Sequence, residues 1–235
     1  MDTQRTSDRT GPGRVAATAL AAVLLVCSIL GISFSLLLTP GPTALATSLF
    51  SDERGTGLTH EECARVGQNV LAFSMGYDDA DLPWGTGETP TTLGEQSRAH
   101  LISVRSLFLG TIRFAVVSSV ALAAMLAVCA RRFGRRCAGT ALIVGGACSI
   151  GIAALFAMLA SVDFYTLFNW LHGWFFSSGS WLFPADALLI KSLPEPLWMF
   201  LGALFGVLIA ALSTACVVGG RRLRRARLED ELLPA

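Results

Sequence analysis

The sequence is poor in charge, and that shortage is its most informative property. Charged residues make up only 15% of its 235 residues, against about 25% in a typical soluble domain, while 53% are hydrophobic. The formal net charge of +1 says nothing about partners, because what matters is where the charges lie along the chain; we expect no nucleic-acid partner. This composition is typical of a membrane protein.

Several common catalytic motifs are also missing. The sequence contains no G-x-S-x-G, no H-E-x-x-H, no P-loop and no dinucleotide-binding fingerprint. Familiar hydrolase, metalloprotease and nucleotide-binding chemistries are therefore not indicated. No motif implies a cofactor, and we expect none.

Cysteine and histidine are too sparse for a metal centre. Of the six cysteines, only Cys63 lies outside the apolar runs and their basic flanks. His60 and Cys63 are three residues apart, but two ligands without a second pair do not make a typical zinc site. We predict no metal site and no disulfide within the polar segments.

Four apolar runs are long enough to cross a bilayer. A helix needs roughly 20 apolar residues to span a hydrocarbon core about 30 Å thick, and a bilayer forces such runs to be helical because every backbone group must be paired internally. The runs are Val15–Leu38, Leu107–Ala130, Ala138–Val162 and Leu197–Gly219. The predicted fold class is an all-α membrane protein, a bundle of four transmembrane helices.

The first run has an alternative interpretation as a cleavable signal peptide. A basic start precedes it, and Ala44-Leu45-Ala46 resembles a cleavage site. The run is about twice as long as a usual signal-peptide core, and Pro40-Gly41-Pro42 separates it from the alanines. We expect the run to be retained as a helix. Cys27 does not resemble a lipoprotein acceptor, because Leu25-Val26 lacks the small residue expected before such a cysteine.

Arginine placement predicts the orientation. Clusters of arginine precede the first run, fill the turn between the second and third, and follow the fourth, whereas most acidic residues lie in the other connections. Since Lys and Arg favour the cytoplasmic side, we expect both termini to be cytoplasmic. The predicted organisation is a cytoplasmic tail at 1–14, one transmembrane domain at 15–219 with extracytoplasmic segments 39–106 and 163–196, and a basic cytoplasmic tail at 220–235.

Each extracytoplasmic segment contains a predicted short amphipathic helix that caps the outer mouth of the bundle. Residues 59–75 begin with Thr59 and Glu62, the spacing of a capping box, and then show an apolar face. Residues 164–176 are dense in aromatics, as is usual at a membrane boundary. No helix breaker lies between Thr92 and the second apolar run, so that helix is expected to project above the membrane.

Two histidines are candidates for acid–base chemistry. His100 and His172 each lie at the outer boundary of an apolar run, and imidazole titrates near neutrality. Arg105 lies close to His100 and is a candidate for stabilising negative charge in a substrate. Arg113 lies deeper in the apolar run, where it either snorkels to the headgroups or contacts a lipid oxygen. A transporter or channel is disfavoured because the runs lack Asp, Glu and Lys.

Two motifs stand out in the sequence. The one in the second predicted extracytoplasmic segment comprises Leu167–Phe176, Gly179–Phe183, Asp186, Leu189, Ile190, Leu193–Glu195 and Trp198, and the one before the second apolar run comprises Glu95, His100, Val104 and Arg105. Together they resemble a family of bacterial integral membrane proteins that includes the lipoprotein intramolecular transacylase, which implies a bacterial cell membrane as the location. Ser103 stands at a position that usually carries Asp in the family.

The resemblance implies an acyltransferase. Characterised members move the sn-2 acyl chain of a diacylglyceryl-modified cysteine onto the α-amine of that cysteine. Carried over, this makes His100 and His172 the catalytic pair and diacylated lipoproteins or membrane lipids the partners. The candidate substrate-binding residues are Arg105, Arg113, Asp186, Trp174 and Trp181. The alternative is a membrane protein that binds lipid or lipoprotein in the same groove without catalysis.

Overall fold

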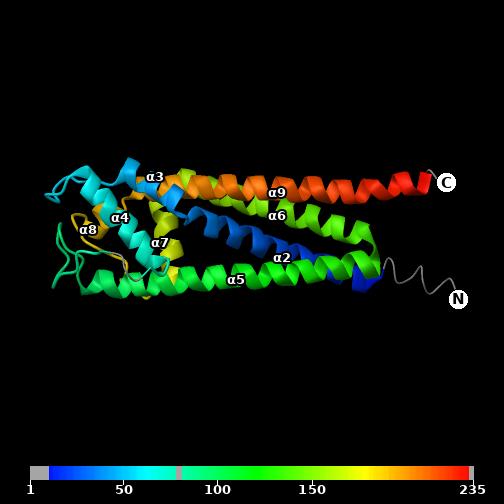
Figure 1. Ribbon diagram of the computed structural model, residues 1–235, viewed down its shortest axis with the longest axis horizontal. Coiled ribbons are helices and arrows are strands. Elements are labelled where there is room, and N and C mark those ends of the chain that lie inside the picture. Colours follow the sequence, from blue (N-terminus) through cyan, green and yellow to red (C-terminus); the bar gives the residue numbers. More distant parts are fainter. Residues whose placement is uncertain (1–10, 78–80, 233–235) are drawn as a thin grey trace. The chain divides into compact units, whose positions relative to one another are not determined.

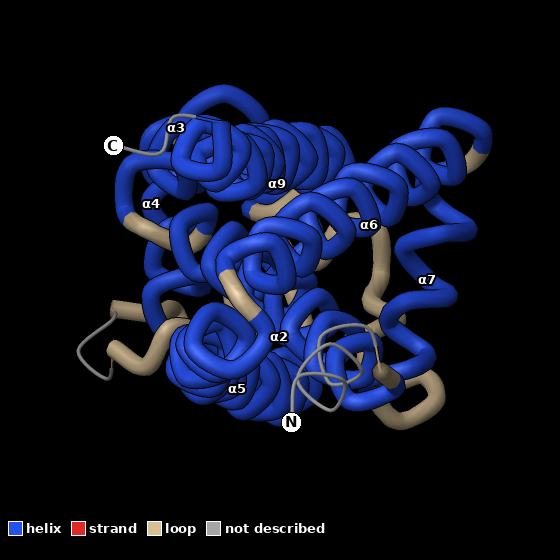
Figure 2. Tube along the Cα trace, turned by 90° about the vertical axis from the view of Figure 1, so that its right-hand side faces the viewer, coloured by secondary structure: helices blue, strands red, loops and turns tan. Residues whose placement is uncertain are grey.

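The protein is helical throughout the part that the structure covers. The computed structural model describes residues 11–77 and 81–232, with side chains up to residue 225. Within those residues there is no strand, only an isolated bridge between Trp84 and Leu93 (Figure 2). The helices are α2 (Pro12–Leu37), α3 (Pro40–Phe50), α4 (His60–Ser74), α5 (Glu95–Phe133), α6 (Arg135–Val162), α7 (Phe164–Phe175), α8 (Leu188–Ser192) and α9 (Glu195–Leu232).

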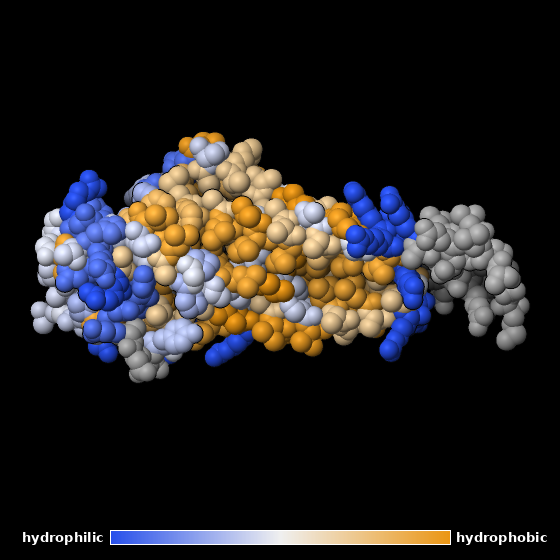
Figure 3. Space-filling model, turned by 45° about the horizontal axis from the view of Figure 1, so that its top comes forward, coloured by the Kyte–Doolittle hydropathy of each residue, from blue (hydrophilic) through white to orange (hydrophobic). Residues whose placement is uncertain are grey.

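Four of these helices are long and apolar enough to cross a membrane, which confirms the predicted fold class. They are α2, α5, α6 and the Glu195–Arg225 part of α9, and Figure 1 shows them as the long helices of the chain. On the face drawn in Figure 3, hydrophobic side chains make up most of the surface of the long helices. That surface suits lipid rather than water.

Helix α5 is longer than a membrane crossing requires. Its 39 residues correspond to roughly 58 Å at about 1.5 Å per residue, nearly twice the thickness of a hydrocarbon core. It runs without a break from Glu95, in agreement with the absence of a helix breaker in this stretch. The extra turns carry His100.

The two predicted short helices are present, and local capping explains where they begin. In α4, the Thr59 side chain accepts a hydrogen bond from the Glu62 backbone while Glu62 accepts one from the Thr59 backbone, so the predicted capping box is formed. In α7, the Asp163 carboxylate accepts a hydrogen bond from the backbone N–H of Thr166 at 3.0 Å.

Two further helices, α3 and α8, were not predicted from the sequence. Helix α3 begins with Pro40, and proline suits the first position of a helix because its missing N–H would be unpaired there in any case. The Pro-Gly-Pro sequence therefore starts a helix here rather than forming an extended linker. Helix α8 has only five residues, too few to show a periodic pattern.

The chain divides into two compact units. One comprises residues up to 33, residues 113–156 and residues from 206 onward; the other comprises residues 34–112 and 157–205. In the first unit, glycines allow close helix packing: a Cβ on Gly220 would lie 2.6 Å from the carbonyl oxygen of Gly139, and one on Gly145 would lie 2.8 Å from that of Ala22. The second unit contains both motifs that carry the family resemblance.

The core of the second unit holds its short helices together. Leu93, Leu188 and Leu197 are fully buried. Helix α4 packs so tightly on α8 that a Cβ on Gly67 would lie 2.7 Å from the carbonyl oxygen of Ser192. The Lys191 ammonium also pairs with Asp52 at 2.8 Å. These contacts fix α4 and α8, both of which contribute to the cavity described next.

Candidate functional site

An apolar cavity of about 200 Å³ lies within the second unit. Helices α4, α5, α7 and α8, the segment that follows α7 and the start of α9 all contribute to its lining, with side chains such as Val70, Val104, Phe108, Leu171 and Leu189. His100 and His172 are the titratable side chains in that lining. The cavity therefore combines an apolar lining with two groups that can exchange protons near neutral pH.

The two imidazoles lie next to each other. Their ring centroids are 6.2 Å apart, and the ring planes make an angle of 27°. His100 comes from the second turn of α5, and His172 comes from the last turn of α7. The structure thus brings the two sequence-predicted catalytic candidates, 72 positions apart in the chain, to one cavity.

His100 has an unused polar atom. Its side chain is only 8% exposed, and among the described residues its Nδ1 finds no hydrogen-bond partner. A buried polar atom without a partner costs about 1–3 kcal/mol, so such atoms are often found where a ligand supplies the partner. Nδ1 of His100 is therefore available to a polar atom of a bound molecule.

His172 is oriented by its own helix. Its Nδ1 lies 2.9 Å from the carbonyl oxygen of Phe168, one turn earlier in α7. A carbonyl can only accept, so Nδ1 carries the proton and the lone pair of the neutral ring is on Nε2. Burial lowers the pKa of His172 from its usual 6.5, and the Phe168 carbonyl opposes this only in part. The neutral, proton-accepting form is thus favoured.

Aromatic rings surround both histidines. The Phe176 ring lies 4.9 Å from that of His100, and the Phe183 ring lies 5.7 Å from it. The Phe168 ring lies 4.0 Å from His172, and Trp181 lies 6.1 Å from it. These rings limit the access of water, which strengthens electrostatic interactions at the imidazoles.

Glu88 fixes the start of the helix that carries His100, and the sequence analysis did not identify it. The backbone N–H and the hydroxyl of Ser97 donate to the two oxygens of Glu88, at 2.8 and 2.6 Å. Ser97 is fully buried and lies one turn before His100. The available signal is a lone acid in the turn at 85–90, a few residues before the start of α5 at Glu95, where negative charge is favourable.

The same turn of α5 also holds the segment that follows α7. The Gln96 amide donates to the carbonyl oxygen of Leu182 at 3.0 Å, and the Trp181 indole donates to Asn169 at 3.3 Å. Trp181 and Phe183 are thereby placed in the cavity wall beside the histidines. Of the aromatic substrate-binding candidates, Trp181 is the one that lines the cavity.

The other sequence-predicted site residues lie outside the cavity lining. Arg105 donates to the carbonyl oxygen of Gly76 at 3.3 Å, and its guanidinium lies 5.4 Å from the Phe73 ring. Trp174 is 62% exposed and packs against Trp170, with ring centroids 4.2 Å apart. Asp186 is exposed. Arg113 is also exposed and belongs to the first compact unit.

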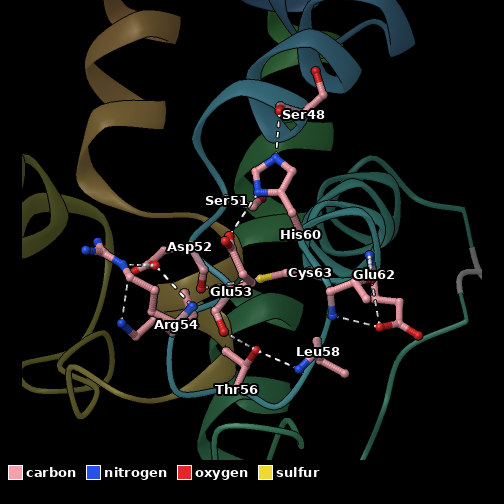
Figure 4. A network of polar contacts seen from close by, with 12 residues as sticks. Ser48, Ser51, Asp52, Glu53, Arg54, Thr56, Leu58, His60, Glu62 and Cys63 are labelled. Atoms are coloured by element: carbon pink, nitrogen blue, oxygen red, sulfur yellow. Dashed lines mark hydrogen bonds and ion pairs between the residues drawn. The ribbon is translucent and has the colours of Figure 1, made fainter.

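The third histidine, His60, has a structural environment (Figure 4). Its Nε2 lies 2.8 Å from the carbonyl oxygen of Ser48 in α3, and its Nδ1 lies 3.0 Å from Glu53. The Ser48 carbonyl and the Glu53 carboxylate raise the pKa of His60 above its usual 6.5. Cys63 lies beside this network, with Sγ 3.7 Å from the carbonyl oxygen of Asp52.

Metal binding has no support among the residues that the structure describes. Across residues 11–77 and 81–232, no group of three or more His, Cys, Asp or Glu side chains is placed to hold a metal ion.

Comparison with known proteins gives a family match and a structural match. The family model of the lipoprotein intramolecular transacylase Lit matches residues 17–198. The crystal structure of the membrane-integral lipoprotein intramolecular transacylase Lit from Bacillus cereus is similar, with a TM-score of 0.74 at 15% identity, and the alignment covers 94% of this chain and 100% of that one.

Two structures of variants of the Bacillus cereus protein, each with one histidine replaced, are also similar. The variant in which arginine replaces the histidine gives a TM-score of 0.70 and covers 92% of this chain and 94% of that one. The variant in which alanine replaces the histidine gives a TM-score of 0.69, and the alignment covers 92% of this chain and 96% of that one. Both are 15% identical to this chain. No curated protein matches the sequence.

Proposed function

Because the chain belongs to the lipoprotein intramolecular transacylase family, we propose that it is a membrane transacylase that acts on diacylated lipoproteins. The proposed reaction moves the sn-2 acyl chain of the diacylglyceryl group onto the α-amine of the same N-terminal cysteine. The observation that carries this proposal is the pair of imidazoles, 6.2 Å apart, in an apolar cavity.

His172 is the proposed general base. Its neutral form presents a lone pair on Nε2, because Nδ1 donates to Phe168. The attacking amine loses a proton to this nitrogen as its nitrogen bonds to the ester carbonyl carbon. When the bond between that carbon and the glycerol oxygen breaks, the imidazolium returns the proton to the glycerol oxygen. Atoms and protons balance within one substrate molecule.

His100 is the proposed partner of the substrate's oxygen. Its unpaired Nδ1 is buried at the cavity, and with a proton there it donates to the ester carbonyl oxygen. That hydrogen bond strengthens as negative charge develops during the attack. No serine or cysteine nucleophile is needed, since the substrate carries both the amine and the ester, and orienting them supplies much of the rate.

The acyl chain to be transferred fits along α5. Leu101, Val104 and Phe108 follow His100 along the cavity lining and lead away from the histidines. Their spacing, with intervals of three and four residues, keeps them on one helix face. An ester held at the imidazoles therefore has an apolar path for its chain.

The proposal is tested with a purified chain and a synthetic diacylglyceryl lipopeptide. Intramolecular transfer leaves the mass of the lipopeptide unchanged, so the product is identified by fragmentation, which locates the acyl group on the amine or on the glycerol. His100→Ala and His172→Ala should each lose the N-acyl product. His60→Ala is the matched control, because that histidine lies outside the cavity lining.

The family match supports lipoproteins and membrane lipids as partners, and the orientation proposed for the chain follows from its arginines. With both termini cytoplasmic, residues 59–75 and 163–196 are extracytoplasmic, on the side where the lipid-modified cysteine would be presented. Cysteines introduced one at a time at Gly134 and at Gly179 test this with a membrane-impermeant maleimide. Labelling of intact cells at Gly179 alone supports the orientation, and labelling at Gly134 alone reverses it.

A further inference from the structure

A second apolar cavity, of about 280 Å³, adjoins the first. The two cavities share lining residues, and the second also has residues of its own. The shared residues are Phe168, Trp181, Phe183, Ile190, Leu193 and Trp198, and those lining only the second include Tyr165, Asn169, Leu182, Ala185 and Glu195. Both cavities lie within the second compact unit.

Helix α7 supplies a wall to each cavity. Its first two turns, with Phe164, Tyr165 and Asn169, line the second cavity, whereas Leu171 and His172 in later turns line the first. Phe168, which immediately precedes Asn169, lines both cavities. Its ring packs against His172 at 4.0 Å and against Trp198 at 6.0 Å. Aromatic side chains thus separate two adjacent apolar spaces.

The second cavity offers little to a charged headgroup. Asn169 already accepts from the Trp181 indole and donates to the carbonyl oxygen of Tyr165 at 2.9 Å. Among the lining residues given for this cavity, Glu195 is the charged one, and no basic side chain is among them. A phosphate or carboxylate is therefore disfavoured, while the aromatic and aliphatic lining suits a hydrocarbon chain.

We propose that the second cavity binds the acyl chain that stays on the glycerol. This inference rests on the proposed function, in which the substrate carries two acyl chains on neighbouring glycerol carbons. With the sn-2 ester at His100 and His172 and its chain in the first cavity, the sn-1 chain passes the aromatic partition of Phe168, Trp181 and Phe183. Two adjoining apolar spaces that share one wall match a ligand with two chains and one head.

Burial of the retained chain in the second cavity would strengthen substrate binding. Each methylene group of the retained chain that leaves water for the second cavity stabilises the bound substrate. The reacting amine and ester are already held at the imidazoles by the first chain. The second cavity would therefore affect how tightly the substrate binds and which chain length it prefers, without providing a reacting group.

The test compares two lipopeptides in the purified chain, one with long sn-1 and sn-2 chains and one with an acetyl group at sn-1. Ala185→Trp fills the second cavity from an exposed position. It should raise KM for the long-chain lipopeptide by about tenfold, the effect of leaving roughly two methylene groups in water. It should leave KM for the acetyl analogue and kcat for both within about twofold. Ala99→Trp, an exposed position on α5 that lines neither cavity, is the matched control.

Binding is measured separately, by displacement of a fluorescent diacylated lipopeptide, so that the inference and the proposed function can fail independently. Weaker displacement by the long-chain lipopeptide in Ala185→Trp, with unchanged displacement by the acetyl analogue, supports the inference even if no N-acyl product forms. Equal changes for both lipopeptides in Ala185→Trp and in a second plug, Leu182→Trp, would overturn it. So would a wild-type chain that binds both lipopeptides equally well.

Discussion

Glu88 binds Ser97 through both of its carboxylate oxygens, at 2.8 Å to the backbone N–H and 2.6 Å to the hydroxyl. These two hydrogen bonds cap the N-terminus of α5, and His100 lies in the second turn of that helix. A cap of this kind is worth about 0.5–2 kcal/mol. It also ties the glycine-rich turn before α5 to the position of a candidate catalytic imidazole.

The first prediction concerns this cap. Glu88→Gln should lower the rate of acyl transfer about tenfold with KM nearly unchanged. The two donors of Ser97 bind different oxygens of Glu88, and the amide replaces one of these acceptors by an NH2 group, so His100 loses its fixed position. Steady-state kinetics on the purified chain measure both constants. Glu61→Gln, an exposed acid in the first turn of α4, is the control. A KM increase with unchanged kcat would contradict a positioning role.

The second prediction concerns the pH dependence of the reaction. Burial lowers the pKa of His172 below 6.5, so the proton-accepting form should already dominate at neutral pH. The rate should show a step from His172 with a midpoint below about pH 6.5, in addition to the step from the substrate α-amine, whose usual pKa is about 7.7–8.0. A rate profile at saturating substrate separates the two steps. A profile whose only step lies above pH 7 would show that His172 is not the base.

The third prediction concerns how stability depends on pH, because the contributions of His172 and His60 change with pH in opposite directions. His172 has a lowered pKa in the folded chain, so the unfolded chain binds a proton more readily and stability falls as pH drops below 6.5. His60 has a raised pKa, so its contribution is present below 6.5 and is lost as pH rises through the raised value. Thermal unfolding between pH 5 and pH 8 should therefore show His60→Gln losing stability mainly at low pH. A loss confined to high pH would contradict the sign.

The fourth prediction concerns the packing of α4 on α8. Gly67→Ala should destabilise the chain by about 1–3 kcal/mol, because the added Cβ would lie 2.7 Å from the carbonyl oxygen of Ser192. Gly110→Ala is the matched control, since a Cβ there meets nothing within 4 Å and alanine favours a helix. Thermal unfolding in detergent distinguishes them. Equal melting temperatures for the two variants would contradict the close contact.

The fifth prediction concerns Ser103, which stands where the resembling family usually has Asp. Its hydroxyl donates to the carbonyl oxygen of Ala99 at 3.1 Å, and the side chain is exposed and outside the cavity lining. Ser103→Asp should therefore change the transfer rate by less than about threefold, well below the effect of losing a general base. A rise of tenfold or more would place a carboxylate at 103 in contact with an imidazole.

The long helices could be predicted from the sequence because a bilayer imposes one solution on a long apolar run. The capping box at Thr59 was equally visible, since its two residues are three apart. Helix α3 was not predicted, although proline at its start suits a first helical turn. The five residues of α8 are too few for any periodicity.

The residues of the candidate site could be predicted from the sequence only where a single residue was informative by itself. His100 and His172 stood out because histidine is rare in this chain and titrates near neutrality. Glu88 did not stand out, because its role depends on a turn that brings it back onto Ser97 nine residues later. Arg105 donates to the carbonyl oxygen of Gly76, a contact between distant segments that only the folded chain reveals, and its role as a substrate-binding residue stays a prediction.

The fragmentation pattern of a diacylglyceryl lipopeptide after incubation with the purified chain shows directly whether the chain is a transacylase. We predict that one acyl group moves from the glycerol to the α-amine, and that His100→Ala and His172→Ala each slow this transfer by about 10²–10⁴ while His60→Ala does not. A wild-type chain that binds the lipopeptide but leaves both acyl groups on the glycerol would contradict it.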